Sequence, residues 1–413
     1  MKYWPAIVSA AVALAVAIPV LHELVPGIRL FERATATPEK DDVPGPEVSE
    51  ALGTVEVDRM FLGEQGATAP AGPGRIAHLT VDPRVQRAAD AAVKARRVPH
   101  GGAILMDVRT GEILAYASRR GGNAKDDPLT SAKAPATDVF KVITATALVN
   151  VTGATSSTPL CHRDPGKKLE LDDLIEDEEK DTWCPPLGEA LARNLDAPFA
   201  RASYRGLDAG VLEKTAEAFG FGSTLAFDLP IEASRVSIPT TDEGLVQGSI
   251  GAGHATMSAL QGLLMASVVA SKGMMVRPVL VRSVEASGGK VVYRAPRGPR
   301  YTRQVITHKT AEELSEMMFE TTEIGEGFRS FHDEMGLPIL GDGKAAGMTG
   351  AERVGKDADQ TTWFIGFAPV HAPEVAIATM ARNRRGASGN AQALAVDVLR
   401  AYFESRGKPE PSS

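Results

Sequence analysis

The sequence has few cysteines, few aromatic residues and no excess of positive charge. Its 413 residues include two cysteines, so the fold cannot rest on a framework of disulfides. Aromatic residues make up 5% of the chain, and 45 lysines and arginines are outnumbered by 52 aspartates and glutamates, which gives a formal net charge of −7. This balance argues against a protein that binds nucleic acid. No internal repeat period is present.

The sequence has one long apolar run, and it lies at the N-terminus. No charged residue occurs between Lys2 and Glu23, and the run over 5–21 is just long enough to span a membrane. The Ala-Val-Ala sequence at 15–17 resembles a signal-peptide cleavage site. We therefore expect residues 1–25 to be a single-pass membrane anchor or a cleaved signal peptide. Either would place the rest of the chain in the periplasm or extracellular space.

Both flanks of the expected domain lack hydrophobic periodicity. Residues 26–75 mix proline, glycine and charge, which predicts a flexible linker with at most a short docked segment at 55–62. The chain ends in RGKPEPSS, and residues 404–413 are expected to be a disordered tail.

The region over 76–403 has the patterning of one α+β domain. A helix is expected to start at Asp82, followed by a strand hairpin over 101–118. A second hairpin is expected over 360–383 and a closing helix over 390–405. Strand pairs at both ends with helices between them predict one antiparallel sheet, flanked by helices, whose strands come from both ends of the domain.

The segment PATDVFKVITATALV, residues 135–149, starts as a loop and continues as an apolar helix. Its one lysine, Lys141, lies three residues after Asp138, so both share a helix face. Taken alone, the pair is an ion pair at a helix start, where the helix dipole favours the carboxylate. The competing interpretation is an active site whose nucleophile has been replaced.

Other stretches place this segment in a known order. The hairpin over 101–118 precedes it, GEALARNLDAPFARAS (188–203) follows it, and AAGMTGAERV (345–354) comes just before WFIGFAP. This order resembles the transpeptidase domain of class B penicillin-binding proteins, whose motifs are S-x-x-K, S-x-N and K-T-G. The resemblance extends over about residues 77–402. It implies the penicillin-binding and β-lactamase-like fold, serine acyl transfer without a cofactor, and a groove for a peptidoglycan stem peptide or a β-lactam.

The resemblance also shows that all three motifs are altered. It places Asp138 at the serine of S-x-x-K and retains Lys141 as the motif lysine. Acyl transfer requires a hydroxyl that can lose its proton and attack a carbonyl, whereas attack by a carboxylate would give an unstable anhydride. The resemblance therefore predicts an Asp138–Lys141 ion pair in place of a nucleophile and its base.

The other two motifs have lost their key residues as well. Asn194 and Asp196 fall at the serine and asparagine of S-x-N, and neither can relay a proton as serine does. Met348, Thr349 and Gly350 fall at K-T-G, so the cation that would attract a substrate carboxylate is missing. On the alternative interpretation, these are ordinary polar residues at a helix start and on a strand.

Thr137 is the only hydroxyl close to the expected nucleophile position. It lies four residues before Lys141, so it could share the lysine's helix face, but its ordinary role would be to cap this helix. A nucleophile one residue out of register would be poorly aimed, and misplacement by an ångström already reduces a rate about a hundredfold. The capping role is therefore preferred.

The two cysteines flank an acidic stretch between the first two motifs. Cys161 and Cys184 are expected to pair outside the cytoplasm, and closing this loop would contribute ~3 kcal/mol by the chain-entropy estimate. A zinc site formed by both cysteines and His162 is the alternative, although the spacing does not enforce it. The acidic run over 172–181 is expected to be a solvated surface rather than a docking site for a basic partner.

Together these features predict a membrane-tethered penicillin-binding-type domain that no longer catalyses transpeptidation. It would act in cell-wall assembly as a binding or regulatory subunit that contacts peptidoglycan stem peptides or an active synthase. The alternative is an active D,D-transpeptidase or carboxypeptidase that uses the hydroxyl of Thr137. A third hypothesis is a sensor that binds a β-lactam or muropeptide noncovalently.

Overall fold

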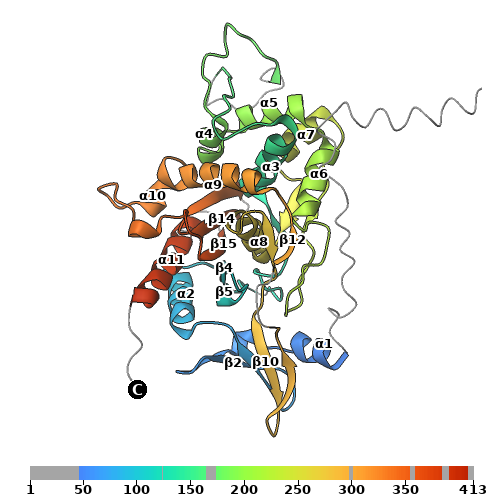
Figure 1. Cartoon of the computed structure of the whole chain (residues 1–413), viewed down its shortest axis with the longest axis vertical. Helices are drawn as coiled ribbons and strands as arrows, with labels where there is room; N and C mark the ends of the chain where they lie inside the picture. The colour runs from blue at the N-terminus through green and yellow to red at the C-terminus, as the bar shows by residue number, and fades with distance from the viewer. Residues whose placement is uncertain are drawn as a thin grey trace, which may run out of the picture. The chain divides into compact units, whose positions relative to one another are not determined.

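A five-stranded antiparallel sheet forms the middle of the computed structural model, which describes residues 46–122, 124–163, 174–296, 301–353, 359–383 and 390–407 (Figure 1). The strand order is β13-β14-β15-β4-β5. The strands are β4 (His100–Asp107), β5 (Ile113–Arg119), β13 (Ala346–Arg353), β14 (Gln360–Ala368) and β15 (Val375–Asn383). Strands from both ends of the folded region therefore pair, as the sequence predicted.

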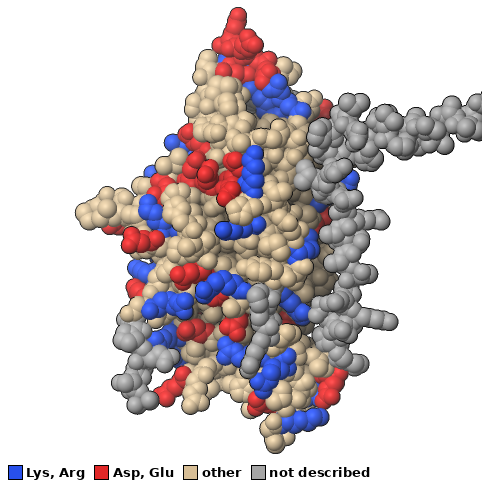
Figure 2. Space-filling view, viewed as in Figure 1, with Lys and Arg blue, Asp and Glu red and all other residues tan. Residues whose placement is uncertain are grey.

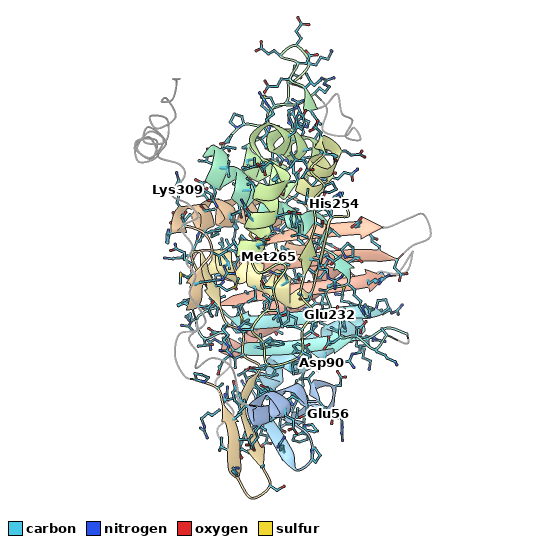
Figure 3. The ribbon with its side chains drawn as sticks, turned by 90° about the vertical axis from the view of Figure 1, so that its right-hand side faces the viewer. Glu56, Asp90, Glu232, His254, Met265 and Lys309 are labelled. Atoms are coloured by element: carbon cyan, nitrogen blue, oxygen red, sulfur yellow. A yellow bond between two sulfur atoms is a disulfide. The ribbon has the colours of Figure 1, made fainter. Side chains whose placement is uncertain are left out.

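Helices cover both faces of this sheet. On one face lies α8 (Ala259–Ala270), whose residues are all buried, as expected for a helix enclosed on every side. Figure 3 labels Met265 of α8, the helix that packs against strands β14 and β15 of this sheet. On the other face, α2 (Pro83–Ala95) and α11 (Ala391–Gly407) pack against each other and form a separate apolar cluster with the sheet. The α+β architecture predicted from the sequence is confirmed.

Further helices lie around the first motif and α8, with two exceptions. They are η3 (Thr137–Phe140), α3 (Lys141–Thr152), α4 (Leu187–Ala192), α5 (Asp196–Gly206), α6 (Ala209–Ala218), α7 (Asp242–Ser249), α9 (His308–Glu323), α10 (Phe328–Phe331) and η5 (Gly341–Gly343). The exceptions are α10, which contacts α9 and α11, and η5, which lies against Phe403 of α11. Short strands complete this part: β6 (Ala134–Pro135), β7 (Arg235–Val236) and β8 (Ala255–Met257) form one sheet, and β9 (Met274–Val276) pairs with β12 (Tyr301–Gln304).

The predicted helix start and hairpin turn are present. The Asp82 side chain accepts hydrogen bonds from the backbone N–H groups of Arg84 and Val85, with Pro83 at the first helical position. The turn of the first hairpin contains Gly111 at φ +73°, where a Cβ would collide with the carbonyl of Arg277. Glycine is therefore required at this turn.

A second sheet includes part of the segment that was predicted to be a linker. Its strand order is β1-β2-β3-β10-β11, with β1 (Phe61–Leu62), β2 (Ala67–Pro70), β3 (Arg75–Leu79), β10 (Val281–Ala286) and β11 (Lys290–Arg294). Helix α1 (Pro46–Gly53) and η2 (Val57–Arg59) precede it. From residue 46 onward the structure therefore differs from the predicted linker over 26–75. Because β3 pairs with β10, about 200 residues later in the chain, local periodicity did not reveal this sheet.

The two predicted terminal segments lie mostly outside the described residues. This applies to residues 1–25, expected to be an anchor or signal peptide, and to 408–413 of the expected tail. Helix α11 continues to Gly407, beyond the predicted start of the tail at 404. Within the described ranges, no helix has both the length and the hydropathy needed to cross a membrane.

Candidate active site

Lys141, at the first position of α3, is fully buried and bonded to three side chains. Its Nζ donates to Oδ1 of Asp138 at 3.3 Å, to Oδ1 of Asn194 at 2.5 Å and to Oδ1 of Asp196 at 2.6 Å. The predicted ion pair with Asp138 is present, and the second motif supplies two further acceptors. An ammonium ion has three donors, so all of them are engaged.

The corner between α4 and α5 brings the second motif to Lys141. Asn194 adopts a left-handed backbone conformation, φ +57°, in the turn between the two helices. Asp196 is the first residue of α5, where the helix dipole stabilises a carboxylate. Its side chain is 50% exposed, so one face of the cluster is open to solvent.

The second oxygen of Asp138 is bonded to the edge of the central sheet. Strand β13 is an edge strand that packs against η3, and the N–H of Ala351 donates to Asp138 Oδ2 at 3.0 Å. The carboxylate therefore accepts from the Lys141 ammonium on one oxygen and from a backbone amide on the other. Both oxygens of the Asp138 side chain are therefore already hydrogen-bonded.

The third motif lies on β13, as expected, but its side chains do not form a polar site. Met348 is fully buried in the main apolar cluster, and Thr349 is also buried. Gly350 faces η3, where a side chain would collide with the hydroxyl of Thr137. Lys344, which precedes this strand, is bonded to Glu323 and so does not replace the missing cation.

Thr137 does not cap the helix, so the preferred role for this residue was wrong. It lies inside η3 with φ +55°, and neither η3 nor α3 has a side-chain cap. Its side chain is 3% exposed and its Oγ1 has no hydrogen-bond partner. The left-handed turn directs this hydroxyl toward Gly350 and leaves it without a hydrogen bond to Lys141.

Glu352 belongs to the same site and was missed in the sequence. It follows Gly350 by two positions on β13, so its side chain projects from the face of the strand on which Gly350 meets η3. Burial and the nearby Asp138 carboxylate raise the pKa of Glu352, and its Oε2 is buried with no partner among the described residues. The sequence carried no signal for this residue, because its place depends on packing between β13 and η3.

Glu352→Gln is expected to raise the melting temperature at pH 7 and to leave it unchanged near pH 4. The folded state raises the pKa of Glu352, so protonated Glu352 is favoured, and stability is lost as the pH rises through the folded pKa. Glutamine does not ionise, so the variant does not lose stability in this way as the pH rises. Thermal unfolding of both proteins between pH 4 and 7 tests this, with the exposed Glu404→Gln as a control. A pH-independent difference would contradict it.

The described partners of the Lys141 ammonium are carboxylates and an amide, and none of them is a hydroxyl. None of these partners is therefore a hydroxyl nucleophile that could transfer its proton to Lys141. Among the described residues, this arrangement can hold charge and accept hydrogen bonds, and no hydroxyl is bonded to Lys141.

The cysteine pair lies beside the second motif. Cys161 and Cys184 form a disulfide, so their sulfur atoms are not available for the alternative zinc site. No group of three metal-ligating side chains lies together in the described part of the chain. Arg201 of α5 donates to the carbonyl of Cys161 and to the Asp181 carboxylate. The base of the disulfide loop is therefore bonded to the helix that carries Asp196.

Replacing both cysteines with alanine is expected to lower the free energy of unfolding by about 2 kcal/mol, below the full chain-entropy value. The loss should be reduced because the Arg201 contacts hold the base of the loop without the disulfide. Urea denaturation of the Cys161→Ala/Cys184→Ala variant measures the change. An unchanged midpoint would contradict the expected contribution of the bond.

The acidic run is exposed for the most part. Glu176, Glu178 and Glu179 are exposed, and acidic side chains gather at the top of Figure 2 over this segment. Asp181 differs, because its side chain is buried and paired with Arg201. Residues 172 and 173 lie outside the described residues.

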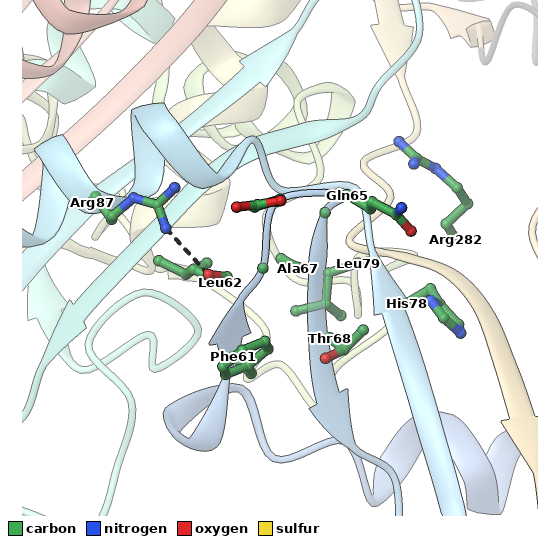
Figure 4. A pocket seen from close by; sticks show the side chains of 12 residues that line it. Phe61, Leu62, Gln65, Ala67, Thr68, His78, Leu79, Arg87 and Arg282 are labelled. Carbon is green, nitrogen blue, oxygen red and sulfur yellow. Dashed lines mark hydrogen bonds between the residues drawn. The ribbon is translucent and has the colours of Figure 1, made fainter. Parts of the chain in front are cut away.

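A pocket of about 690 Å³ lies beside the β1–β2 hairpin, away from the three motifs (Figure 4). Arg87 lies along it and donates to the carbonyl of Leu62, and Arg282, also part of its lining, pairs with Glu112. No motif residue lines this pocket, so we assign the candidate active site to the Lys141 cluster.

Comparison with known proteins agrees with this fold and motif order. The family model of the penicillin binding protein transpeptidase domain matches residues 101–401. The peptidoglycan D,D-transpeptidase PbpA of Mycobacterium tuberculosis is 27% identical over 372 residues, which cover 80% of this chain and 72% of PbpA. The peptidoglycan D,D-transpeptidase MrdA of Haemophilus influenzae is 23% identical and covers 82% of this chain and 58% of MrdA.

Solved structures show the same fold. The crystal structure of PBPA from Mycobacterium tuberculosis has a TM-score of 0.64 at 22% identity, covering 79% of this chain and 82% of that chain. Its penicillin G acyl-enzyme complex has the same TM-score. The D,D-transpeptidase domain of a peptidoglycan glycosyltransferase from Eggerthella lenta has a TM-score of 0.66 at 22% identity, covering 87% of this chain and 91% of that one.

Proposed function

Because the chain belongs to the penicillin binding protein transpeptidase domain family, we propose that it serves peptidoglycan assembly as a binding or regulatory subunit without catalysing acyl transfer. The observation that supports this most strongly is the carboxylate of Asp138, which accepts hydrogen bonds from Lys141 and from the Ala351 amide. It stands at the position that the motif resemblance assigns to the serine nucleophile.

Two chemical consequences follow from a carboxylate at this position. It lacks the hydroxyl proton that a base would remove, and an anhydride formed by its attack would hydrolyse. It also accepts the hydrogen bonds of the two donors around position 138, so an incoming carbonyl oxygen would have to displace it. Both consequences oppose acylation by a stem peptide or a β-lactam.

The proposal includes a place and partners for the protein. Residues 1–25 would anchor the chain in the membrane, with the folded domain in the periplasm or extracellular space. PbpA and MrdA, the relatives with similar sequences, are named as peptidoglycan D,D-transpeptidases. A binding subunit of this fold would contact peptidoglycan stem peptides or an active cell-wall synthase.

Labelling with a fluorescent penicillin tests the proposal, with PbpA of Mycobacterium tuberculosis as the positive control. The native chain is expected to show no fluorescent band after denaturing electrophoresis. Labelling of the native chain that disappears in Thr137→Ala would overturn the proposal in favour of an enzyme that uses the Thr137 hydroxyl. Labelling on any other residue would overturn it as well.

A further inference from the structure

The charge at the candidate active site is predominantly negative. The fully buried Lys141 contributes one positive charge, and Asp138 and Asp196 are bonded to it. Glu352 adds a third carboxylate close to Asp138, whose charge helps to raise the Glu352 pKa. Met348, at the motif's cation position, is an apolar residue in the core. When all three carboxylates are ionised, their net charge together with that of Lys141 is −2.

The site also has more hydrogen-bond acceptors than donors. Lys141 uses its three donors on three acceptors, and the Ala351 N–H is bonded to Asp138. Asp196 makes one hydrogen bond, to Lys141, and half of its side chain is exposed. Two buried polar atoms nearby have no partner within the described part of the chain: the hydroxyl oxygen of Thr137, a residue that is 3% exposed, and Oε2 of Glu352.

We infer that this cluster recognises a cationic ligand, namely the primary ammonium group of a peptide or muropeptide, with Asp196 as its accessible anchor. The inference rests on the proposed function, because it names the chemistry that a noncatalytic site would bind. A primary ammonium brings three N–H donors to a site with surplus acceptors. It also offsets the uncompensated negative charge, whereas a ligand carboxylate would be repelled by Asp138, Asp196 and Glu352.

Three small probes separate ligand charge from ligand shape. Nα-acetyl-lysine amide carries an ammonium and no carboxylate, Nα,Nε-diacetyl-lysine amide is neutral, and acetyl-D-alanyl-D-alanine carries a carboxylate. Isothermal titration calorimetry of the native chain is expected to detect binding of the first probe alone. Because the contact is electrostatic and partly exposed, raising the salt from 50 to 500 mM should weaken that binding.

Charge-neutral variants locate the binding. Asp196→Asn keeps an acceptor for Lys141 and is expected to weaken binding of the ammonium probe about fivefold, the size of a partly exposed ion pair. Glu352→Gln is expected to weaken it by a smaller factor and has no hydrogen bond at Oε2 to lose. Glu404→Gln, an exposed acid on α11 across the central sheet, is the matched control and should bind as the native chain does.

The outcomes are decisive in both directions. Selective ammonium binding that is weakened by Asp196→Asn or Glu352→Gln, in variants that stay folded at the titration temperature, supports the inference. It is overturned if acetyl-D-alanyl-D-alanine binds as tightly as the ammonium probe, if no probe binds at 10 mM, or if Glu404→Gln has the same effect. Penicillin labelling tests the proposed function separately. A chain that is not labelled but prefers the carboxylate probe would contradict this inference and leave the proposed function standing.

Discussion

Asp138→Ser is expected to give this chain a slow covalent penicillin adduct that the native chain lacks. The substitution puts a hydroxyl at the position from which Asp138 now contacts Lys141 Nζ at 3.3 Å. It also releases the Ala351 N–H to donate to the oxygen of the attacked carbonyl. The labelling rate should exceed that of the native chain at least a hundredfold, since positioned acid–base catalysis alone contributes on the order of 10²–10⁴.

The adduct should form slowly because other groups of the site remain altered. Asp196 still pairs with Lys141 at 2.6 Å, so the lysine amine stays engaged with a carboxylate beside the new hydroxyl. Asp138→Ser/Asp196→Asn is therefore expected to label faster than the single variant. Met348 supplies no cation for the penicillin carboxylate, and its buried place means that a lysine introduced there would lose its hydration.

Matched variants separate the effect of the new hydroxyl from the effect of removing the Asp138 carboxylate. Asp138→Ala frees the same amide without adding a nucleophile and should stay unlabelled. Asp138→Ser/Lys141→Met lacks the base and should label 10²–10⁴-fold more slowly than Asp138→Ser. Labelling rates come from gel fluorescence over time. A folded Asp138→Ser protein that never labels would contradict the claim that residue 138 is what prevents acylation.

Lys141→Met is expected to lower the free energy of unfolding by about 3 kcal/mol. Removing one partner of a buried ion pair leaves the other charge uncompensated, which typically costs 3–5 kcal/mol. The lower end applies because Asp138 keeps the Ala351 N–H and because the half-exposed Asp196 can be hydrated. Urea denaturation measures the loss. Lys309→Met on α9, an exposed lysine, should change stability by no more than about 0.5 kcal/mol.

A double-mutant cycle assigns that loss to the ion pair. Asp138→Asn keeps the shape of the side chain and removes its charge, so adding it to Lys141→Met should restore part of the stability. The coupling energy should be on the order of 1–3 kcal/mol, as for residues in one buried network. Strictly additive single-variant effects would contradict a structural role for the pair.

The sequence predicted those parts of the fold that local pattern determines. The Asp82 helix cap, both hairpins of the central sheet and the Asp138–Lys141 pair follow from neighbouring residues. Motif order also associated Asn194 and Asp196 with Lys141, more than 50 residues away in the chain.

The parts that depend on remote packing were not predictable in the same way. Strand β2 lies within the segment over 26–75 that was predicted to be a linker, and it belongs to a sheet in which β3 pairs with β10, about 200 residues later. The Ala351 amide reaches Asp138 across 213 residues, and Glu352 enters the site through the same contact between β13 and η3. The left-handed backbone of Thr137 turned an expected cap into a buried, unpartnered hydroxyl.

The mass of the intact native protein after incubation with penicillin G is the most direct test of a noncatalytic site. The account predicts an unchanged mass at saturating penicillin over several hours, while Asp138→Ser gains the mass of one penicillin. An added mass of one penicillin on the native chain, at any residue, would contradict it.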